Sequence, residues 1–243
     1  MYHSHATGAS PFQCGQDATE TLLSGNRVFA SLRSGEFQLP ADELYEPHQP
    51  FAAVLSCTDA RIPISRMFQQ DINRILQVRV SGNVLSDEAA GSLELALARF
   101  PTLKSIAVIG HNDCEAVATA MDFYRRWLEQ SPPHLSRGIA SLVQRLLPAV
   151  REAEEASHRP QTLAWISPLA LATIINASNT ALQLQQLVTQ WGRSDVHVTF
   201  GVYDLSDRLI HTWDNEHGFH SGLSSPFTHS DQLLEYLAAT QRV

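Results

Sequence analysis

Short apolar runs alternate with amphipathic stretches along much of the chain, and this alternation predicts strands interleaved with helices. The segments FAAVLS (51–56) and SIAVIG (105–110) are almost continuously apolar. Such runs are typical of strands that are covered on both faces of a sheet. The segment RILQVRV (74–80) instead alternates apolar and polar positions, as a half-covered strand does. The pattern therefore predicts three strands in the first half of the chain.

Helix signals fall between these predicted strands. Residues 15–33 form an amphipathic stretch, which predicts an N-terminal helical arm. Ser86 is a suitable helix cap, because acidic residues follow it directly, and Pro101 ends the apolar repeat that begins there. Further helices are predicted up to about residue 130, over 136–157 and over 167–191.

The order of these segments predicts an α/β fold. Strands that alternate with helices form a mostly parallel central sheet with helices on its faces. The segments VHVTFGVY (196–203) and RLIHTW (208–213) are joined by only four residues, so we expect one antiparallel edge strand. No internal repeat or linker interrupts the pattern, so one domain over residues 1–243 is expected. The segment NEHGFHSG, which contains His217 and His220, is interpreted as a solvated loop.

Three metal-binding residue types follow two of the predicted strands. Cys57 follows the first strand, while His111 and Cys114 follow the strand at 105–110. Ligand sites in open α/β sheets form outside the carboxyl ends of the strands, so the fold should bring these residues together. Two thiolates and one imidazole are suitable ligands for zinc, with a fourth position left for water or substrate.

Each of these residues also has a structural interpretation. A single cysteine after an apolar strand is usually a small core residue, and the H-x-x-C pair alone is a weak signal. A redox pair of Cys57 and Cys114 is possible, although the chain has no C-x-x-C motif. Asp59 and Arg61 could form an exposed ion pair, worth roughly 0–1 kcal/mol. Beside a metal ligand, however, the Arg61 guanidinium can donate hydrogen bonds to the Asp59 carboxylate and so keep it ionised and oriented.

The composition of the chain argues against several classes of protein. The chain has 17 basic and 25 acidic residues, a formal net charge of −8, which argues against nucleic-acid binding. No apolar run reaches the length of a membrane span. Three cysteines do not form a disulfide framework, and the first ten residues lack the features of a secretory signal. We therefore expect a cytoplasmic protein.

The spacing of the candidate residues resembles that of the β-class carbonic anhydrases. Their C-x-D-x-R motif, followed some fifty residues later by H-x-x-C, is matched by Cys57, Asp59, Arg61, His111 and Cys114. The resemblance covers most of the chain, is strongest over 51–120 and is weak over 121–190. Further similar segments are LLSGNRVF (22–29), VRVSGNV (78–84), GSLELAL (91–97) and FGVYDLSDRLI (200–210).

The resemblance implies a function and a set of roles. It implies one Zn²⁺ per chain, held by Cys57, His111 and Cys114, and reversible hydration of carbon dioxide to bicarbonate. Asp59 and Arg61 would be the catalytic pair that orients the attacking water. In some members of the family the equivalent aspartate becomes a fourth zinc ligand and closes the site, so Asp59 could do so here. A homodimer or a higher even oligomer is also implied.

Several positions depart from the family pattern. Glu115 stands where glycine is usual, and Ser81 stands where a small apolar residue often lines the pocket. Candidate substrate-pocket residues are His48, Gln49, Leu76, Ser81, Gly82 and Asn83, although Leu76 could equally be a core residue. These departures leave two alternatives open: hydrolysis of carbonyl sulfide or carbon disulfide on the same fold, and a non-catalytic zinc-containing relative that acts as a binding subunit.

Overall fold

The structure is a computed structural model that describes residues 14–31, 47–158, 166–214, 218–228, 232 and 234–235. His217 lies outside these residues. The helices are α1 (Gly15–Ser31), α2 (Ile64–Met67), α3 (Asp87–Arg99), α4 (Glu115–Leu128), α5 (Arg137–Ser157) and α6 (Pro168–Gln190), with a short 3₁₀ turn, η2 (Ser81–Asn83). The strands are β1 (Ala52–Ser56), β2 (Ile75–Arg79), β3 (Ser105–His111), β4 (His197–Tyr203), β5 (Ile210–Asp214) and β6 (Gly218–Ser221).

The strands form one six-stranded sheet in the order β2-β1-β3-β4-β5-β6. The first four strands are parallel, and the β4–β5 and β5–β6 pairs are antiparallel. The predicted fold class, a mostly parallel sheet with an antiparallel edge and flanking helices, is therefore confirmed. Within β1, Ser56 lies beside Arg79 of β2 and Ile109 of β3, so the carboxyl ends of these three strands lie together.

The edge of the sheet contains one strand more than the sequence predicts. The segment interpreted as a solvated loop includes β6, which pairs with β5. Phe219 of β6 stacks on the ring of His211, with centroids 5.0 Å apart, and packs on Trp213 at 4.8 Å. These aromatic contacts across the strand pair explain why a segment with strong turn signals forms a strand.

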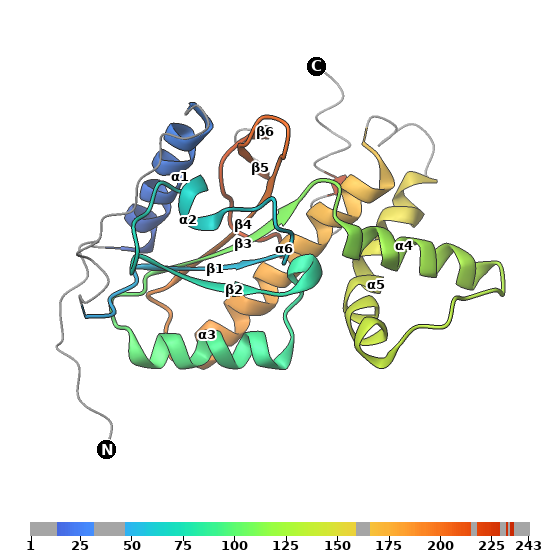
Figure 1. Ribbon diagram of the computed structural model, residues 1–243, viewed down its shortest axis with the longest axis horizontal. Helices are drawn as coiled ribbons and strands as arrows, with labels where there is room; N and C mark the ends of the chain where they lie inside the picture. The colour runs from blue at the N-terminus through green and yellow to red at the C-terminus, as the bar shows by residue number, and fades with distance from the viewer. Residues whose placement is uncertain are drawn as a thin grey trace.

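Helices cover both faces of the sheet (Figure 1). In that view α3 lies below the sheet, α6 runs obliquely upward from below it, and α1 and α2 lie above it, while α4 and α5 extend beyond the carboxyl end of β3. Every residue of β1 and β3 is buried, as the continuous apolar runs predict for strands covered on both sides. The core is thus built around the two strands that lead into Cys57 and His111.

Local signals explain where the surrounding helices begin. The Ser86 side chain accepts a hydrogen bond from the backbone N–H of Ala89 at the start of α3, and Ser167 does the same for Ala170 at the start of α6. Pro168 occupies the first turn of α6, where its missing N–H costs nothing. Across the described segments, no helix is both long and apolar enough to cross a membrane.

Candidate metal centre

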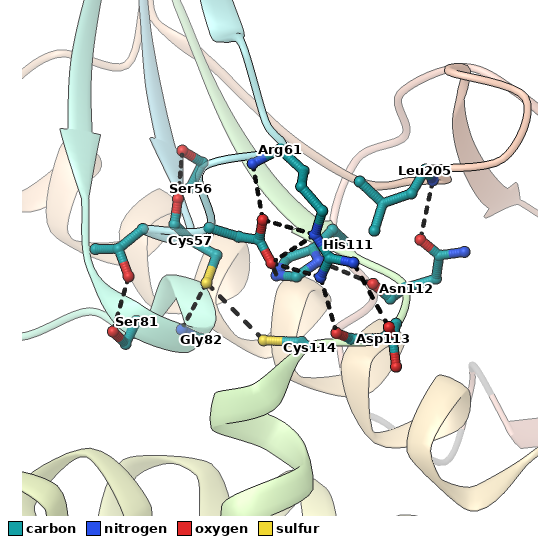
Figure 2. Close-up of polar contacts among 12 residues, drawn as sticks. Ser56, Cys57, Arg61, Ser81, Gly82, His111, Asn112, Asp113, Cys114 and Leu205 are labelled. Carbon is teal, nitrogen blue, oxygen red and sulfur yellow. Dashed lines mark hydrogen bonds and ion pairs between the residues drawn. The ribbon is translucent and has the colours of Figure 1, made fainter.

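The carboxyl ends of β1 and β3 bring three potential metal ligands together. Cys57 directly follows β1, His111 is the last residue of β3, and Cys114 precedes the first turn of α4. Their ligand atoms all lie within 4.8 Å of one another, and the two sulfur atoms are 3.9 Å apart. All three residues are at most 5% exposed. The parallel pairing of β1 and β3 therefore brings Cys57 next to His111 and Cys114, which follow it by more than fifty positions in the chain (Figure 2).

The hydrogen bonding of His111 leaves its Nε2 atom available to bind a cation. Its Nδ1 lies 2.8 Å from the backbone carbonyl oxygen of Asn112, which can only accept a hydrogen bond. Nδ1 must therefore carry the proton, and Nε2 keeps a free lone pair. Nε2 is buried and has no hydrogen-bond partner among the described residues. A buried nitrogen lone pair beside two sulfur atoms fits a zinc ion well.

The two thiols perturb each other strongly. The hydrogen bond from Cys114 is the main cause that lowers the pKa of Cys57 below its usual value. The same bond, together with burial, raises the pKa of Cys114 well above its usual value. A second hydrogen bond to the Cys57 sulfur comes from the backbone N–H of Gly82, at 3.3 Å. One thiolate is thus favoured even without a metal, and a bound cation would stabilise both.

Asp59 and Arg61 form a tight pair at the mouth of this centre. The Arg61 Nη2 and Nε atoms donate to the two carboxylate oxygens of Asp59 at 2.7 and 3.0 Å, and the Arg61 backbone N–H donates at 2.8 Å. These bonds lower the pKa of Asp59 to about 2, so the carboxylate is ionised at neutral pH. Its Oδ2 atom lies 3.9 Å from Nε2 of His111, which places the carboxylate next to the three ligands.

Arg79 and Thr58, which sequence reasoning missed, make further contacts around this loop. Arg79 donates to the backbone carbonyls of Cys57 and Asp59, and so braces the chain on both sides of Thr58. The hydroxyl of Thr58 lies 2.9 Å from that of Ser81. Arg79 lies within the VRVSGNV segment that resembles the family, but a contact to backbone carbonyls leaves no pattern of residue types to find.

Asn112 anchors the loop that contains His111. Its side chain accepts a hydrogen bond from the backbone N–H of Leu205 and donates one to Asp204. Asp204 also belongs to a second group of potential ligand atoms, with Asp207 and His211. These side chains already bond to their neighbours, since Asp204 accepts from Ser206 and His211 contacts Asp207 at 2.7 Å. We interpret this second group as a brace between the β4–β5 turn and the metal centre.

The candidate pocket residues divide into two groups. His48 and Gln49 precede β1, at the opposite end of that strand from Cys57, and the His48 ring packs on Phe100. Within one chain they therefore lie away from the metal centre. Leu76 is the second residue of β2 and is partly buried against the core, which agrees with its alternative interpretation as a core residue.

Ser81, Gly82 and Asn83 form the turn η2 beside Cys57. Ser81 contacts Thr58 and Gly82 contacts the Cys57 sulfur, so both border the centre. Asn83 is buried, with its side-chain nitrogen lacking a partner among the described residues. Glu115, although adjacent to Cys114, is exposed at the start of α4. Its side chain therefore lies in solvent rather than crowding the ligands.

Comparison with known proteins agrees with this geometry. A family model described as carbonic anhydrase matches residues 52–210, which include all three candidate ligands and the Asp59–Arg61 pair. Carbonic anhydrase 2 of Mycobacterium tuberculosis is 29% identical over 107 residues, which are 43% of this chain and 51% of that protein. A carbonic anhydrase of Mycolicibacterium smegmatis is 28% identical over 133 residues, 51% of this chain and 62% of that protein. The matched regions thus span between half and two thirds of these relatives.

Solved structures show the same fold at low sequence identity. The β-carbonic anhydrase CcaA superposes with a TM-score of 0.57 and 16% identity, covering 72% of this chain and 85% of that one. A structure described among two tetrameric β-carbonic anhydrases of Sordaria macrospora gives a TM-score of 0.51 and 14% identity, covering 72% and 84%. Together with the family match over more than half of the residues, this fold shows that the chain belongs to the β-class carbonic anhydrase family.

Proposed function

We propose that this protein is a zinc enzyme that reversibly hydrates carbon dioxide to bicarbonate and a proton. One observation carries the proposal: two thiols and an imidazole nitrogen lie within 4.8 Å of one another beside an ionised, arginine-held carboxylate. Membership of the carbonic anhydrase family supports the same conclusion. Cys57, His111 and Cys114 would hold one Zn²⁺ per chain.

Zinc in such a site supplies a Lewis acid that makes water more acidic, although two thiolate ligands make it less effective than three histidines. The protein's own groups then orient the reactants. Asp59 is ionised, so both of its oxygens can only accept hydrogen bonds. It can accept the hydrogen of the attacking oxygen and so direct that oxygen's lone pair toward the carbon of carbon dioxide.

Arg61 keeps Asp59 available for that role. Its guanidinium donates to both carboxylate oxygens, which fixes the plane of the carboxylate. A second, longer contact joins Arg61 to the Asp113 carboxylate at 3.6 Å, which helps to keep the guanidinium in place. This arrangement supports the open form of the site, in which Asp59 pairs with Arg61 and would leave a bound zinc accessible to water. Arg61 is therefore a positioning residue and Asp59 the catalytic group.

The hydroxyls of Thr58 and Ser81 are a reason to test alternative substrates as well as carbon dioxide. Their contact at 2.9 Å places polar groups beside Cys57, where the family usually has a small apolar residue. The alternatives are hydrolysis of carbonyl sulfide or carbon disulfide, and a zinc-containing subunit without catalytic activity. We further propose a homodimer or higher even oligomer, as the family resemblance implies, and a cytoplasmic location, as the small number of cysteines indicates.

Stopped-flow measurement separates these three possibilities. Zinc-loaded protein is mixed with carbon dioxide, and pH-indicator absorbance records the proton that hydration releases. Carbonyl sulfide, and carbon disulfide in a parallel series, are supplied under the same conditions. We expect fast hydration and slow or absent release of sulfide. Release of sulfide without hydration would favour the hydrolase, and neither reaction in fully zinc-loaded protein would favour the binding subunit.

A further inference from the structure

We infer that Asn176, in the part of the chain where the family resemblance is weakest, is a positioning residue for the metal centre and acts through Gly82. The inference rests on the proposed metal site, because it concerns how the Cys57 sulfur is presented to a cation. Asn176 lies near the middle of α6, 94 positions along the chain from Gly82.

Two hydrogen bonds link Asn176 to the sulfur through a single residue. The Asn176 side-chain nitrogen donates to the backbone carbonyl of Gly82 at 2.8 Å. The backbone N–H of Gly82 donates to the Cys57 sulfur at 3.3 Å. Asn176 is 4% exposed and Gly82 is also buried, so water does not readily replace either contact. The amide of Asn176 thus fixes the peptide group on one side of Gly82, and the peptide group on its other side contacts the sulfur.

The conformation of Gly82 makes this support important. Gly82 has a φ of +69°, in the left-handed region that residues with a side chain rarely adopt. A Cβ atom at this position would lie 3.2 Å from Ala116 and 3.1 Å from Leu146. A flexible residue in an unusual conformation needs external contacts to hold one orientation. The hydrogen bond from Asn176, together with the Asn83 N–H bond to Val80 at 2.8 Å, supplies them.

A hydrogen bond to a thiolate changes the sulfur as a metal ligand. The donated N–H draws electron density from the sulfur and lowers the energy of its lone pairs. It also sets the direction in which the remaining lone pairs point. Loss of the Asn176 contact should release Gly82, lengthen or break its bond to Cys57, and leave a more electron-rich and less well oriented sulfur.

Cobalt(II) substitution tests this inference without relying on catalytic activity. Cobalt bound by thiolates gives a sulfur-to-metal charge-transfer band in the near ultraviolet, and a more electron-rich sulfur moves that band to longer wavelength. The test variant is Asn176→Leu, which keeps the side-chain shape and removes the donor. The matched control is Asn179→Leu, on the same helix and lining the same cavity of about 210 Å³. The described residues show no hydrogen bond from Asn179 to the Ser81–Asn83 turn.

We expect the charge-transfer band of Asn176→Leu to move to longer wavelength, with cobalt binding about 10- to 100-fold weaker than in the parent protein. Asn179→Leu should match the parent in both. An unshifted band and an unchanged cobalt affinity in Asn176→Leu would overturn the inference. A lower unfolding temperature would not rescue it, because a loss of stability alone would show only that Asn176 contributes to packing. If Asn176→Leu does not fold, Asn176→Asp replaces it as the test variant, because it also lacks the N–H donor. The same band shift and loss of cobalt affinity are then expected. Failure of the parent itself to bind cobalt would instead contradict the proposed metal site.

Discussion

At the scale of single residues, the proposed chemistry rests on Asp59 and Arg61. They are two positions apart after β1, and the Arg61 guanidinium reaches both oxygens of the carboxylate. Arg61 is half exposed, so solvent screens the pair and it contributes little to stability. In the proposed mechanism, the Arg61 guanidinium matters because it orients the Asp59 carboxylate and keeps it ionised. That carboxylate lies a few ångströms from the imidazole of His111.

Replacing Arg61 by alanine should therefore separate metal binding from catalysis. We expect Arg61→Ala to retain zinc, since Arg61 offers no ligand atom, and to lose hydration activity by about 10-fold or more. Asp113→Asn is the matched control, because it weakens the longer contact to Arg61 and leaves Asp59 intact. Elemental analysis and stopped-flow rates measure the two properties. An Arg61→Ala protein as active as its parent would show that the pair does not orient the reaction.

The charge of Asp59 should stay constant over the pH range in which hydration is measured. Its pKa is lowered to about 2 from an ordinary value of 3.8, so it is ionised at every pH above about 4. Any stability that it contributes is present above the ordinary value and is lost only as the pH falls through about 2. Between pH 6 and 9 Asp59 should not titrate.

We therefore predict that the hydration rate rises with pH along a single-proton curve, set by the water that the metal activates. The measurement is a stopped-flow profile from pH 6 to 9. A steeper rise, from almost no activity near neutrality, would indicate that opening and proton loss are coupled. Asp59 would then occupy the fourth zinc position at low pH, and the open form would be wrong.

Sequence reasoning identified the three candidate ligands that the structure brings together, but not the residues that brace them. Cys57, His111 and Cys114 could be identified because two thiols and an imidazole form a recognisable ligand set at two strand ends. Arg79 and Asn176 could not, because each binds a backbone carbonyl, and every residue has one. His48 and Gln49 were placed near the site by family analogy, and the structure puts them at the other end of β1.

Strands could be predicted from the sequence where burial on both faces requires a continuous apolar run. β1 and β3 follow from continuous apolar runs, and both are fully buried. β6 could not be predicted, since its four residues contain turn formers and its pairing depends on the ring of Phe219 meeting His211 and Trp213 across the strands. The turn η2 was likewise missed, because a left-handed glycine in so short an element leaves no periodic pattern.

The start of α4 allows the role of Glu115 to be tested. Glu115 is exposed in the first turn of the helix, where a negative charge is favourable. We expect Glu115→Gln to lower the free energy of unfolding by about 0.3–1 kcal/mol and to leave the hydration rate unchanged. Glu88→Gln, in the first turn of α3, is the matched control and should behave alike. A large rate change in Glu115→Gln alone, with zinc intact, would mean that Glu115 acts on the centre.

At the scale of the whole molecule, the sheet ends in β2 on one side. An edge strand presents unpaired backbone groups on which another chain can add. Together with the family resemblance, this leads us to predict a dimer or a larger even assembly of the 26.9 kDa chain. Sedimentation equilibrium should give an even multiple of that mass. A species of 26.9 kDa that persists at the highest concentrations would contradict the predicted assembly.

The most direct test of the whole account is a zinc titration of metal-free protein, followed by the rate of carbon dioxide hydration. Cys57, His111 and Cys114 provide one set of ligand atoms per chain. The account predicts a rate that rises linearly with added zinc and levels off at one zinc per chain, and it predicts no such rise in Cys114→Ser. A parent protein that takes up one zinc per chain and still fails to hydrate carbon dioxide would contradict the proposed function.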